Sequence, residues 1–414
     1  MEVPLFFRCP ISMELMSDPV TISTGVTYER RNIEQWFYRY KKTTCPATMQ
    51  HLESFDLTPN HTLKRLILSW LDQASRSPSS SSPPSPARPN REELVSQLGK
   101  LESTPFKVSC LRKLRSMVET DEDARDDFPK LGGIETLGTV IFQILIDPGD
   151  CATFRACEEA LAILSRLSLS DEASIRLLSK PECLKSMSTM LQRGTAEARL
   201  NTVTILRKMS KNQSEYYWVK IIAADQDTGV FKSLLELLSD EICTKAGSIA
   251  LDVLIELTSK SRKNQVKAIE AGAVWTLIEL LSDVGNNNRH RCEKMLYLLK
   301  RLCGCPEGRS AFVDHGLAIS VVSKKVLRVS DVATKIGVKI LWLICSVRPT
   351  ERVLEEMVMF GAVKKLMGLV HIDGRCSTKE RAMKIIKLHG NSWTQYPCFP
   401  SEFRDYLRLA CARD

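Results

Sequence analysis

Cys9 and Cys45, each followed by a proline, are the residues of this 414-residue chain that first suggest chemistry. Thiolates and histidines such as His51 and His61 are ligands of structural zinc, which needs four of them, usually in pairs such as C-x-x-C. Here both cysteines are solitary, and the two histidines do not complete two sites with them. The spacing therefore argues against a metal, and we expect hydrogen bonds and apolar packing to hold the two loops.

The other cysteines do not indicate a catalytic site. The chain has 14 cysteines, and in a reducing compartment such residues are most often small buried hydrophobes. Those that stand in apolar helical patterns include Cys157, Cys292, Cys345 and Cys411. A thioester-forming cysteine would need a partner such as His or Asp, and none stands in a supporting pattern. No G-x-x-x-x-G-K-[ST] or G-x-G-x-x-G motif occurs, so we expect no cofactor.

The elements that must position these loops lie between about residues 6 and 72. Turn signals flank the β-prone run 20–22, which predicts one arm of a hairpin. A first helix is predicted by the apolar stripe of Ile33, Trp36, Phe37 and Tyr40. A second helix is predicted after the N-cap Asn60, with a stripe of Leu63, Leu66, Ile67, Trp70 and Leu71. The pattern predicts a compact α+β module with a thin core.

These residues resemble a U-box, the metal-free relative of the RING finger found in ubiquitin ligases. The motifs that carry the resemblance recur in order as FRCPISMELMSDPV at 7–20, TGVTYER at 24–30, IEQW at 33–36, CPAT at 45–48 and LTPNHTL at 57–63. The resemblance implies a ligase that binds a ubiquitin-charged conjugating enzyme and never bonds covalently to ubiquitin itself.

The same resemblance implies a docking face for the conjugating enzyme. It comprises Ile11 and Met13 from the first loop, Trp36 from the helix and Pro46 from the second loop. The alternative is that these side chains are core, which we expect more for Trp36 than for Ile11, because Ile11 follows a proline in a loop. The partners implied are a conjugating enzyme and ubiquitin, and a homodimer through this module is a further hypothesis.

Two residues depart from the commonest pattern of the family. Glu29 stands where Asp is frequent, and Glu is a poorer cap for the helix that begins near Arg30. Met49 stands where many relatives carry Arg or Lys. A cation there can bridge the conjugating enzyme and ubiquitin by hydrogen bonds, and a methionine cannot. We therefore treat Met49 as a modulator of thioester activation.

A change of composition follows the module. Residues 75–90 are rich in serine and proline, which predicts a disordered linker. Ser77, Ser82 and Ser85 each precede a proline, so they are candidate phosphorylation sites as well as parts of a solvated spacer.

From residue 91 to 414 the pattern is one of amphipathic helices that recur with a period. Glycines at 229, 272, 316 and 361 open similar turns at intervals of 43, 44 and 45 residues, with related copies at Gly133 and at 181–184. This period, with two or three helices per unit, is typical of armadillo or HEAT repeats. We expect the glycines to supply a positive φ or a close backbone approach between helices.

A U-box (residues 1–74), a linker (75–90) and an armadillo-type all-α array with a C-terminal cap (91–414) resemble the plant U-box ubiquitin ligases. In such a ligase the groove of the repeats would hold a protein substrate, whose lysine attacks the thioester at high effective concentration. The alternative is a non-catalytic armadillo scaffold or adaptor with a structural or inactive U-box.

The charge distribution limits the classes of binding partner that we expect. The net charge of +9 comes from outside residues 1–75, whose basic and acidic residues balance. Arg207, Lys208 and Lys211 stand among acids on predicted helices, which is typical of solvated faces. The run 260–263 is too short for a nucleic-acid patch, and no stretch of about 20 apolar residues predicts a membrane span. We expect a location in the cytoplasm, with the nucleus as a second site.

Overall fold

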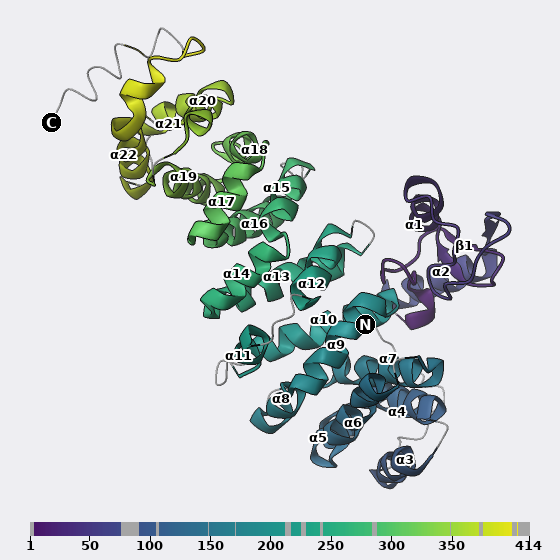
Figure 1. Cartoon of the computed structure of the whole chain (residues 1–414). Helices are drawn as coiled ribbons and strands as arrows, with labels where there is room; N and C mark the ends of the chain where they lie inside the picture. The colour runs from purple at the N-terminus through teal and green to yellow at the C-terminus, as the bar shows by residue number, and fades with distance from the viewer. Residues whose placement is uncertain are drawn as a thin grey trace. The chain divides into compact units, whose positions relative to one another are not determined.

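A computed structural model describes residues 4–75, 91–104, 107–147, 149–169, 171–211, 217–224, 229–240, 243–283, 288–347, 349–371, 376–399 and 404. The linker, with its three Ser-Pro sites, lies outside the described residues, as do Cys411 and most of the expected C-terminal cap. The expected fold class is confirmed: a small mixed module is followed by an array of helices (Figure 1).

The N-terminal module is built on a small antiparallel sheet. The 3-10 turn η1 (Leu5–Phe7) precedes strands β1 (Pro19–Thr21), β2 (Thr27–Glu29) and β3 (Thr58–Pro59), which pair in the order β2-β1-β3. Val20 lies opposite Tyr28 on one side and Pro59 on the other. The predicted hairpin arm at 20–22 is therefore confirmed as β1. Gly25 closes the hairpin with a φ of 79°, a conformation that glycine adopts without steric cost.

Two helices complete the module. The first starts as α1 (Arg30–Glu34) and continues as a π-helical turn, η2 (Gln35–Arg39), in which the Tyr40 amide donates to the Gln35 carbonyl at 3.0 Å. Its stripe is confirmed at Ile33 and Phe37, which are buried.

The second helix, α2 (His61–Ser75), begins after Asn60, whose side chain accepts from the Leu63 amide at 2.9 Å, as an N-cap should. Part of its predicted stripe is wrong. Ile67, Leu63 and Trp70 pack on the core, whereas Leu66 and Leu71 are exposed, because the thin core covers only a narrow face of the helix.

The array repeats a pattern of three helices, the third of which is the longest. After α3 (Arg91–Ser103) and α4 (Lys107–Thr120) come α5 (Glu122–Lys130), α6 (Gly133–Ile146), α7 (Cys151–Arg166), α8 (Glu172–Leu178), α9 (Pro181–Arg193), α10 (Ala196–Lys211) and α11 (Tyr217–Ala224). Then follow α12 (Gly229–Ser239), α13 (Thr244–Lys260), α14 (Arg262–Glu270), α15 (Ala273–Asp283), α16 (Arg289–Leu302), α17 (Pro306–Asp314), α18 (Ala318–Lys325), α19 (Asp331–Cys345), α20 (Glu351–Met359), α21 (Ala362–His371) and α22 (Cys376–Trp393).

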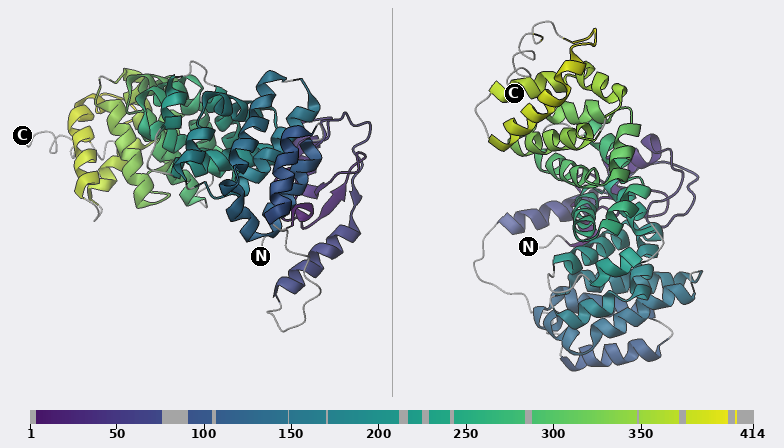
Figure 2. Two further views of the ribbon diagram at one scale, coloured as in Figure 1. Left: turned by 90° about the horizontal axis from the view of Figure 1, so that it is seen from below. Right: turned by 60° about the vertical axis from the view of Figure 1, so that its left-hand side comes forward.

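These helices fall into two compact units, with α3 to α11 in the first, α14 to α22 in the second, and α12 and α13 divided between them. Within the first unit the third helix of each repeat packs on the next, so that α4, α7 and α10 lie side by side (Figure 1). Within the second unit α16, α19 and α22 form the same kind of row (Figures 1 and 2). The third helices therefore form a continuous face in each unit.

The glycine turns are partly as predicted. Gly272 and Gly361 have φ values of 93° and 72°, which confirms the positive φ expected there. At the first copy the positive φ, 75°, lies one residue earlier, at Gly132. Gly133 shows the close approach instead, because a Cβ there would lie 2.3 Å from the Phe128 ring and 2.7 Å from the Phe128 carbonyl oxygen. The prediction is wrong for Gly316, whose φ is not positive.

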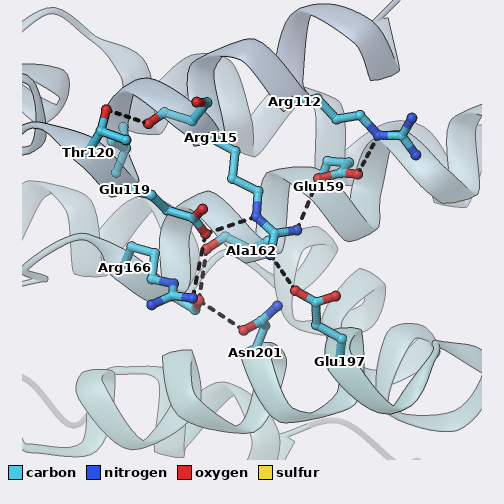
Figure 3. Close-up of polar contacts among 12 residues, drawn as sticks. Arg112, Arg115, Glu119, Thr120, Glu159, Ala162, Arg166, Glu197 and Asn201 are labelled. Atoms are coloured by element: carbon cyan, nitrogen blue, oxygen red, sulfur yellow. Dashed lines mark hydrogen bonds and ion pairs between the residues drawn. The ribbon is translucent and has the colours of Figure 1, made fainter. Parts of the chain in front are cut away.

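An ion-pair network joins the third helices of the first unit (Figure 3). Arg115 on α4 reaches Glu119 on its own helix at 3.1 Å, Glu159 on α7 at 3.2 Å and Glu197 on α10 at 2.5 Å. Its side chain is only 14% exposed. Burial alone would lower the pKa of Arg115, but Glu197 and Glu119 raise it above its ordinary value. Arg115 is therefore a charged link between three successive helices.

Cations also cap helix ends one repeat away. The Lys208 ammonium on α10 donates to the carbonyls of Ser165 and Leu167, at 2.6 and 2.7 Å, where α7 ends. Arg301 on α16 does the same to Thr258 and Ser259 of α13, at 3.2 and 2.6 Å. The last carbonyls of a helix have no partner within it, so these contacts satisfy them. The prediction that Lys208 belongs to a solvated face is wrong for this reason.

We expect Arg115→Met to destabilise the array by about 2–3 kcal/mol, because it leaves three carboxylates close together without their shared cation. Arg112 is the matched control, since it pairs with Glu159 at 2.9 Å but is 64% exposed, and Arg112→Met should cost less than about 1 kcal/mol. Urea unfolding of the full chain, followed by circular dichroism, measures both. Equal shifts of the two midpoints would show that the burial of Arg115 does not increase its contribution to stability.

Candidate functional site

The two Cys-Pro loops of the N-terminal module have the same backbone construction. In the first, Cys9 donates its amide to the Glu14 carbonyl and accepts from the Met13 amide, both at 2.8 Å. In the second, Cys45 makes the equivalent bonds with Gln50 and Met49, again at 2.8 Å. Both methionines have a φ of 58°. The loops at 9–14 and 45–50 are thus a pair of like turns on either side of the first helix.

Hydrogen bonds to sulfur hold the cysteines of both loops. Cys9 Sγ accepts from the Glu29 amide at 3.3 Å and from Asn32 Nδ2 at 3.5 Å. Cys45 Sγ accepts from Thr24 Oγ1 at 3.4 Å and lies 3.0 Å from the Tyr28 hydroxyl. Both thiols are completely buried. Each loop is therefore tied to β2 or to the first helix through its cysteine.

Tyr28 links the second loop to the sheet. Its hydroxyl accepts from the Ala47 amide at 3.1 Å, so its own proton is available for Cys45. Burial, and then Cys45, raise the pKa of Tyr28 far above its ordinary value. Burial would also raise the pKa of the Cys45 thiol, but hydrogen bonds from Thr24, Thr48 and Tyr28 lower it overall. The raised pKa of Tyr28 and the lowered pKa of Cys45 both indicate that Tyr28 keeps its proton and donates a hydrogen bond to the sulfur.

Glu29 has a role that the sequence did not reveal. It makes no side-chain bond to the helix that follows it. Its carboxylate instead accepts from the amides of Ser17 and Asp18, at 2.7 and 3.0 Å, and from the Ser17 hydroxyl at 3.0 Å. The end of the first loop is fixed by these bonds, and Glu is long enough to reach it across the hairpin.

The four residues expected to dock a conjugating enzyme lie on these loops and on the first helix. Ile11 and Met13 are buried, with 5% and 8% exposed, whereas Trp36 and Pro46 are half-buried. The expectation that Trp36 would be more buried than Ile11 is therefore wrong: Ile11 belongs to the core cluster, and Trp36 packs at its edge. The Trp36 indole donates to the Thr44 carbonyl at 2.7 Å, which ties the helix to the second loop.

Met49 projects from the second loop into solvent, with 67% of its surface exposed. Its position next to the half-buried Pro46 is where the family resemblance placed a modulator. Phe6 and Tyr38 are also 67% exposed, and periodicity gave no signal for either. An apolar side chain at such exposure is available to a partner.

Metal binding has no support in the side chains around the loops. No group of three or more His, Cys, Asp or Glu in the described part of the chain is arranged to hold a metal ion. Both loop cysteines already have hydrogen-bond partners. The cysteines of the array are mostly buried as well, and burial raises the pKa of Cys157 and Cys345 to about 12. No helix among the described residues has the length and hydropathy to cross a membrane.

Comparison with known families agrees with this architecture. Residues 3–76 match the U-box domain, and residues 91–407 match the plant U-box protein ARM repeat region. The chain belongs to the plant U-box proteins with armadillo repeats.

Relatives and a solved structure extend the comparison. E3 ubiquitin-protein ligase PUB23 of Arabidopsis thaliana is 34% identical over 96% of this chain and 95% of its own length. E3 ubiquitin-protein ligase PUB22 of the same plant is 32% identical over 98% of each chain. The crystal structure of an engineered protein, 17% identical, covers 77% of this chain and 70% of its own, with a TM-score of 0.52, which shows likeness of fold alone.

The second loop should depend on hydrogen bonds and not on metal. Tyr28→Phe leaves the half-buried Ala47 amide without its acceptor and removes the hydroxyl beside the buried Cys45 sulfur, which we expect to cost about 1–3 kcal/mol of unfolding free energy. Strong chelation of the unmodified protein should leave its melting temperature unchanged. Thermal melting of the full chain measures both effects, with the variant as the positive control. Unfolding on chelation would show that a metal site exists after all.

Proposed function

We propose that this protein is a ubiquitin-protein ligase that brings a ubiquitin-charged conjugating enzyme and a protein substrate together. The observation that carries the proposal is the pairing of a U-box with an armadillo array in one chain, shared along nearly full length with relatives named E3 ubiquitin-protein ligases. The reaction is attack of a substrate lysine on the thioester, which forms an amide bond and releases the thiol of the conjugating enzyme.

The two like loops are the surface that we assign to the conjugating enzyme. Ile11 and Met13 come from one loop, Pro46 from the other, and Trp36 from the helix between them. Small transient interfaces depend on a few apolar anchors. The hydrogen bonds through Cys9, Cys45 and Tyr28 support this assignment because they hold the loops rigid before any partner arrives.

The chain need not carry ubiquitin on one of its own cysteines. A nucleophilic cysteine requires an accessible thiolate. In the U-box, Cys9 and Cys45 are completely buried and hydrogen-bonded. We therefore assign catalysis to positioning: the protein raises the effective concentration of lysine and thioester and leaves the chemistry to the conjugating enzyme.

Substrate recruitment falls to the armadillo array in this proposal. Its third helices form a face in each unit, and such stacked faces are the binding surfaces of repeat proteins.

The second candidate function is a scaffold with an inactive U-box, and Met49 is the residue that favours it, because methionine cannot supply the hydrogen bonds of a cation. Location in the cytoplasm and a homodimer through the U-box stay predictions from the sequence.

We expect Ile11→Ala to abolish self-ubiquitination in a reconstituted mixture. Loss of a central apolar anchor weakens binding of the conjugating enzyme by more than about 1.4 kcal/mol, or roughly tenfold. Titration of the unloaded conjugating enzyme, monitored by calorimetry, gives the change in affinity directly.

Ile22→Ala is the matched control. Ile22 is 3% exposed in the same core, so the two substitutions should destabilise the module alike. Only Ile11 lies on the loop assigned to docking. Equal activity of the two folded variants would refute the docking face, and an inactive wild-type protein would favour the scaffold.

The role of Met49 is tested by Met49→Arg. Arginine offers five donors in a planar fork, and charge-assisted bonds to ubiquitin could add about 1.5–3 kcal/mol. Only the part formed in the transition state raises the rate. We expect faster discharge of ubiquitin onto free lysine in single-turnover assays, with little change in affinity for the conjugating enzyme. Gln50→Arg is the control for added charge, because Gln50 is the next residue and is also exposed. An equal gain in that variant would show that position 49 has no specific role.

A further inference from the structure

An open cleft lies in the first unit where α7 and α10 end. It has a volume of about 610 Å³ and is lined by residues 166–169 together with Arg125, Lys208 and Lys211. Four of its seven lining residues are Arg or Lys, and no carboxylate is among them. They come from α5, α7 and α10, so three elements bring cations to one place.

Hydrogen bonds to backbone carbonyls hold two of the cations in position. Lys208 uses two of its three N–H donors on Ser165 and Leu167, at 2.6 and 2.7 Å. Arg125 directs Nε and Nη2 at the Val118 carbonyl, each at 3.2 Å. A neutral carbonyl fixes the side chain but does not cancel its charge. The cleft is therefore built around cations whose geometry is set before any ligand binds.

The balance of charge in the cleft is positive. Glu119 lies 3.5 Å from Arg166 and offsets one of the four cations. The C-termini of α4, α7 and α10 contribute about half a negative charge each, so roughly one and a half positive charges are left. The pKa of Lys208 is lowered, first by burial and then by Arg166, Arg125 and Lys211. The mutual repulsion of these groups would be relieved by an anion.

We propose that this cleft binds the phosphate group of a phosphorylated serine or threonine in a protein partner. Such a group carries −1.5 to −2 charges at neutral pH and three strong acceptor oxygens, which matches the excess charge, whereas a carboxylate carries a single negative charge. Arginine and lysine are the residues that bind phosphate, and the exposed Ser168 adds a hydroxyl donor.

The shape of the cleft favours a protein chain as the source of the phosphate. The cleft is open at the surface, so an extended segment can cross it. Its two leucines, Leu167 and Leu169, are 0% and 6% exposed. They offer no apolar platform for a nucleotide base or for lipid tails. This inference rests on the proposed function, because the cleft would select protein substrates for ubiquitination. Binding of a phosphorylated peptide needs no ligase activity, however, so phosphate binding and ubiquitin transfer can be tested separately.

The test uses the full chain and two fluorescein-labelled peptide mixtures in buffer of physiological salt. One mixture has a fixed central phosphoserine flanked by mixed residues, and the other has serine at that place. We expect the phosphorylated mixture to bind at least about tenfold more tightly by fluorescence anisotropy. Its binding should slow amide hydrogen exchange at residues 167–169.

Lys211→Glu is the informative variant, because Lys211 is exposed at the end of α10 and its loss leaves the carbonyl caps intact. We expect it to weaken binding of the phosphorylated mixture at least about fivefold without a change in melting temperature. Lys185→Glu is the matched control, an exposed lysine on α9 outside the cleft, and it should bind as the wild type does.

Four results would overturn the proposal. Equal binding of the two mixtures would show that phosphate is not recognised, and unaltered binding by Lys211→Glu would place the phosphate elsewhere. An equal loss in Lys185→Glu would reduce the effect to general charge attraction. If vesicles that contain a phosphoinositide bind the chain in a Lys211-dependent way while neither mixture does, the cleft binds lipid headgroups and not a phosphorylated protein.

Discussion

The structure depends throughout on one constraint: a polar backbone group that leaves water must find another partner. In the N-terminal module the constraint acts on the two Cys-Pro loops, which lie outside the three strands. The sulfur of Cys9 accepts from the Glu29 amide, and the hydroxyl of Tyr28 accepts from the Ala47 amide. In the array it acts on helix ends, and Lys208 and Arg301 satisfy the last carbonyls of the helix one repeat earlier. Both halves of the chain thus use side chains far away in the sequence to complete local backbone turns.

The sequence predicted those parts of the fold that local pattern controls. Asn60 caps its helix as predicted because a cap needs only residues three positions away. Gly272 and Gly361 have the predicted positive φ because a turn between two helices is also local. The prediction failed at Leu66 and Leu71, since their exposure depends on how wide a face the core can cover, which α2 alone does not reveal. At the first copy the two expected roles of glycine fall on neighbouring residues, with the positive φ at Gly132 and the close approach to Phe128 at Gly133.

The candidate site was predictable in its location but not in its exposure. The two Cys-Pro motifs marked both loops, and the resemblance to a U-box gave them a role. Whether Ile11 or Trp36 would be buried depends on the path of the loop over the core, and here the loop directs Ile11 inward. The function of Glu29 was equally hidden, because its partners at Ser17 and Asp18 lie across a hairpin. The Arg115 network could not be predicted for the same reason, because its acidic partners lie on helices one and two repeats further along the chain.

A cation that caps a helix end can serve a second purpose, and the neighbours of each capping residue decide whether it does. Lys365 donates to Ser323 and Val326, and its pKa is lowered by burial and by one further cation, Arg328. At Lys208 three other cations gather around an open cleft. Capping alone needs one positive group per helix end. Lys208 and Arg125 already meet that need at the ends of α7 and α4, so the other two cations exceed what the carbonyls require. This excess, which Lys365 lacks, distinguishes a binding site for an anion from a structural cap. A repeat array can therefore gain a ligand site without a new backbone feature, by adding charges around a contact that the fold already needs.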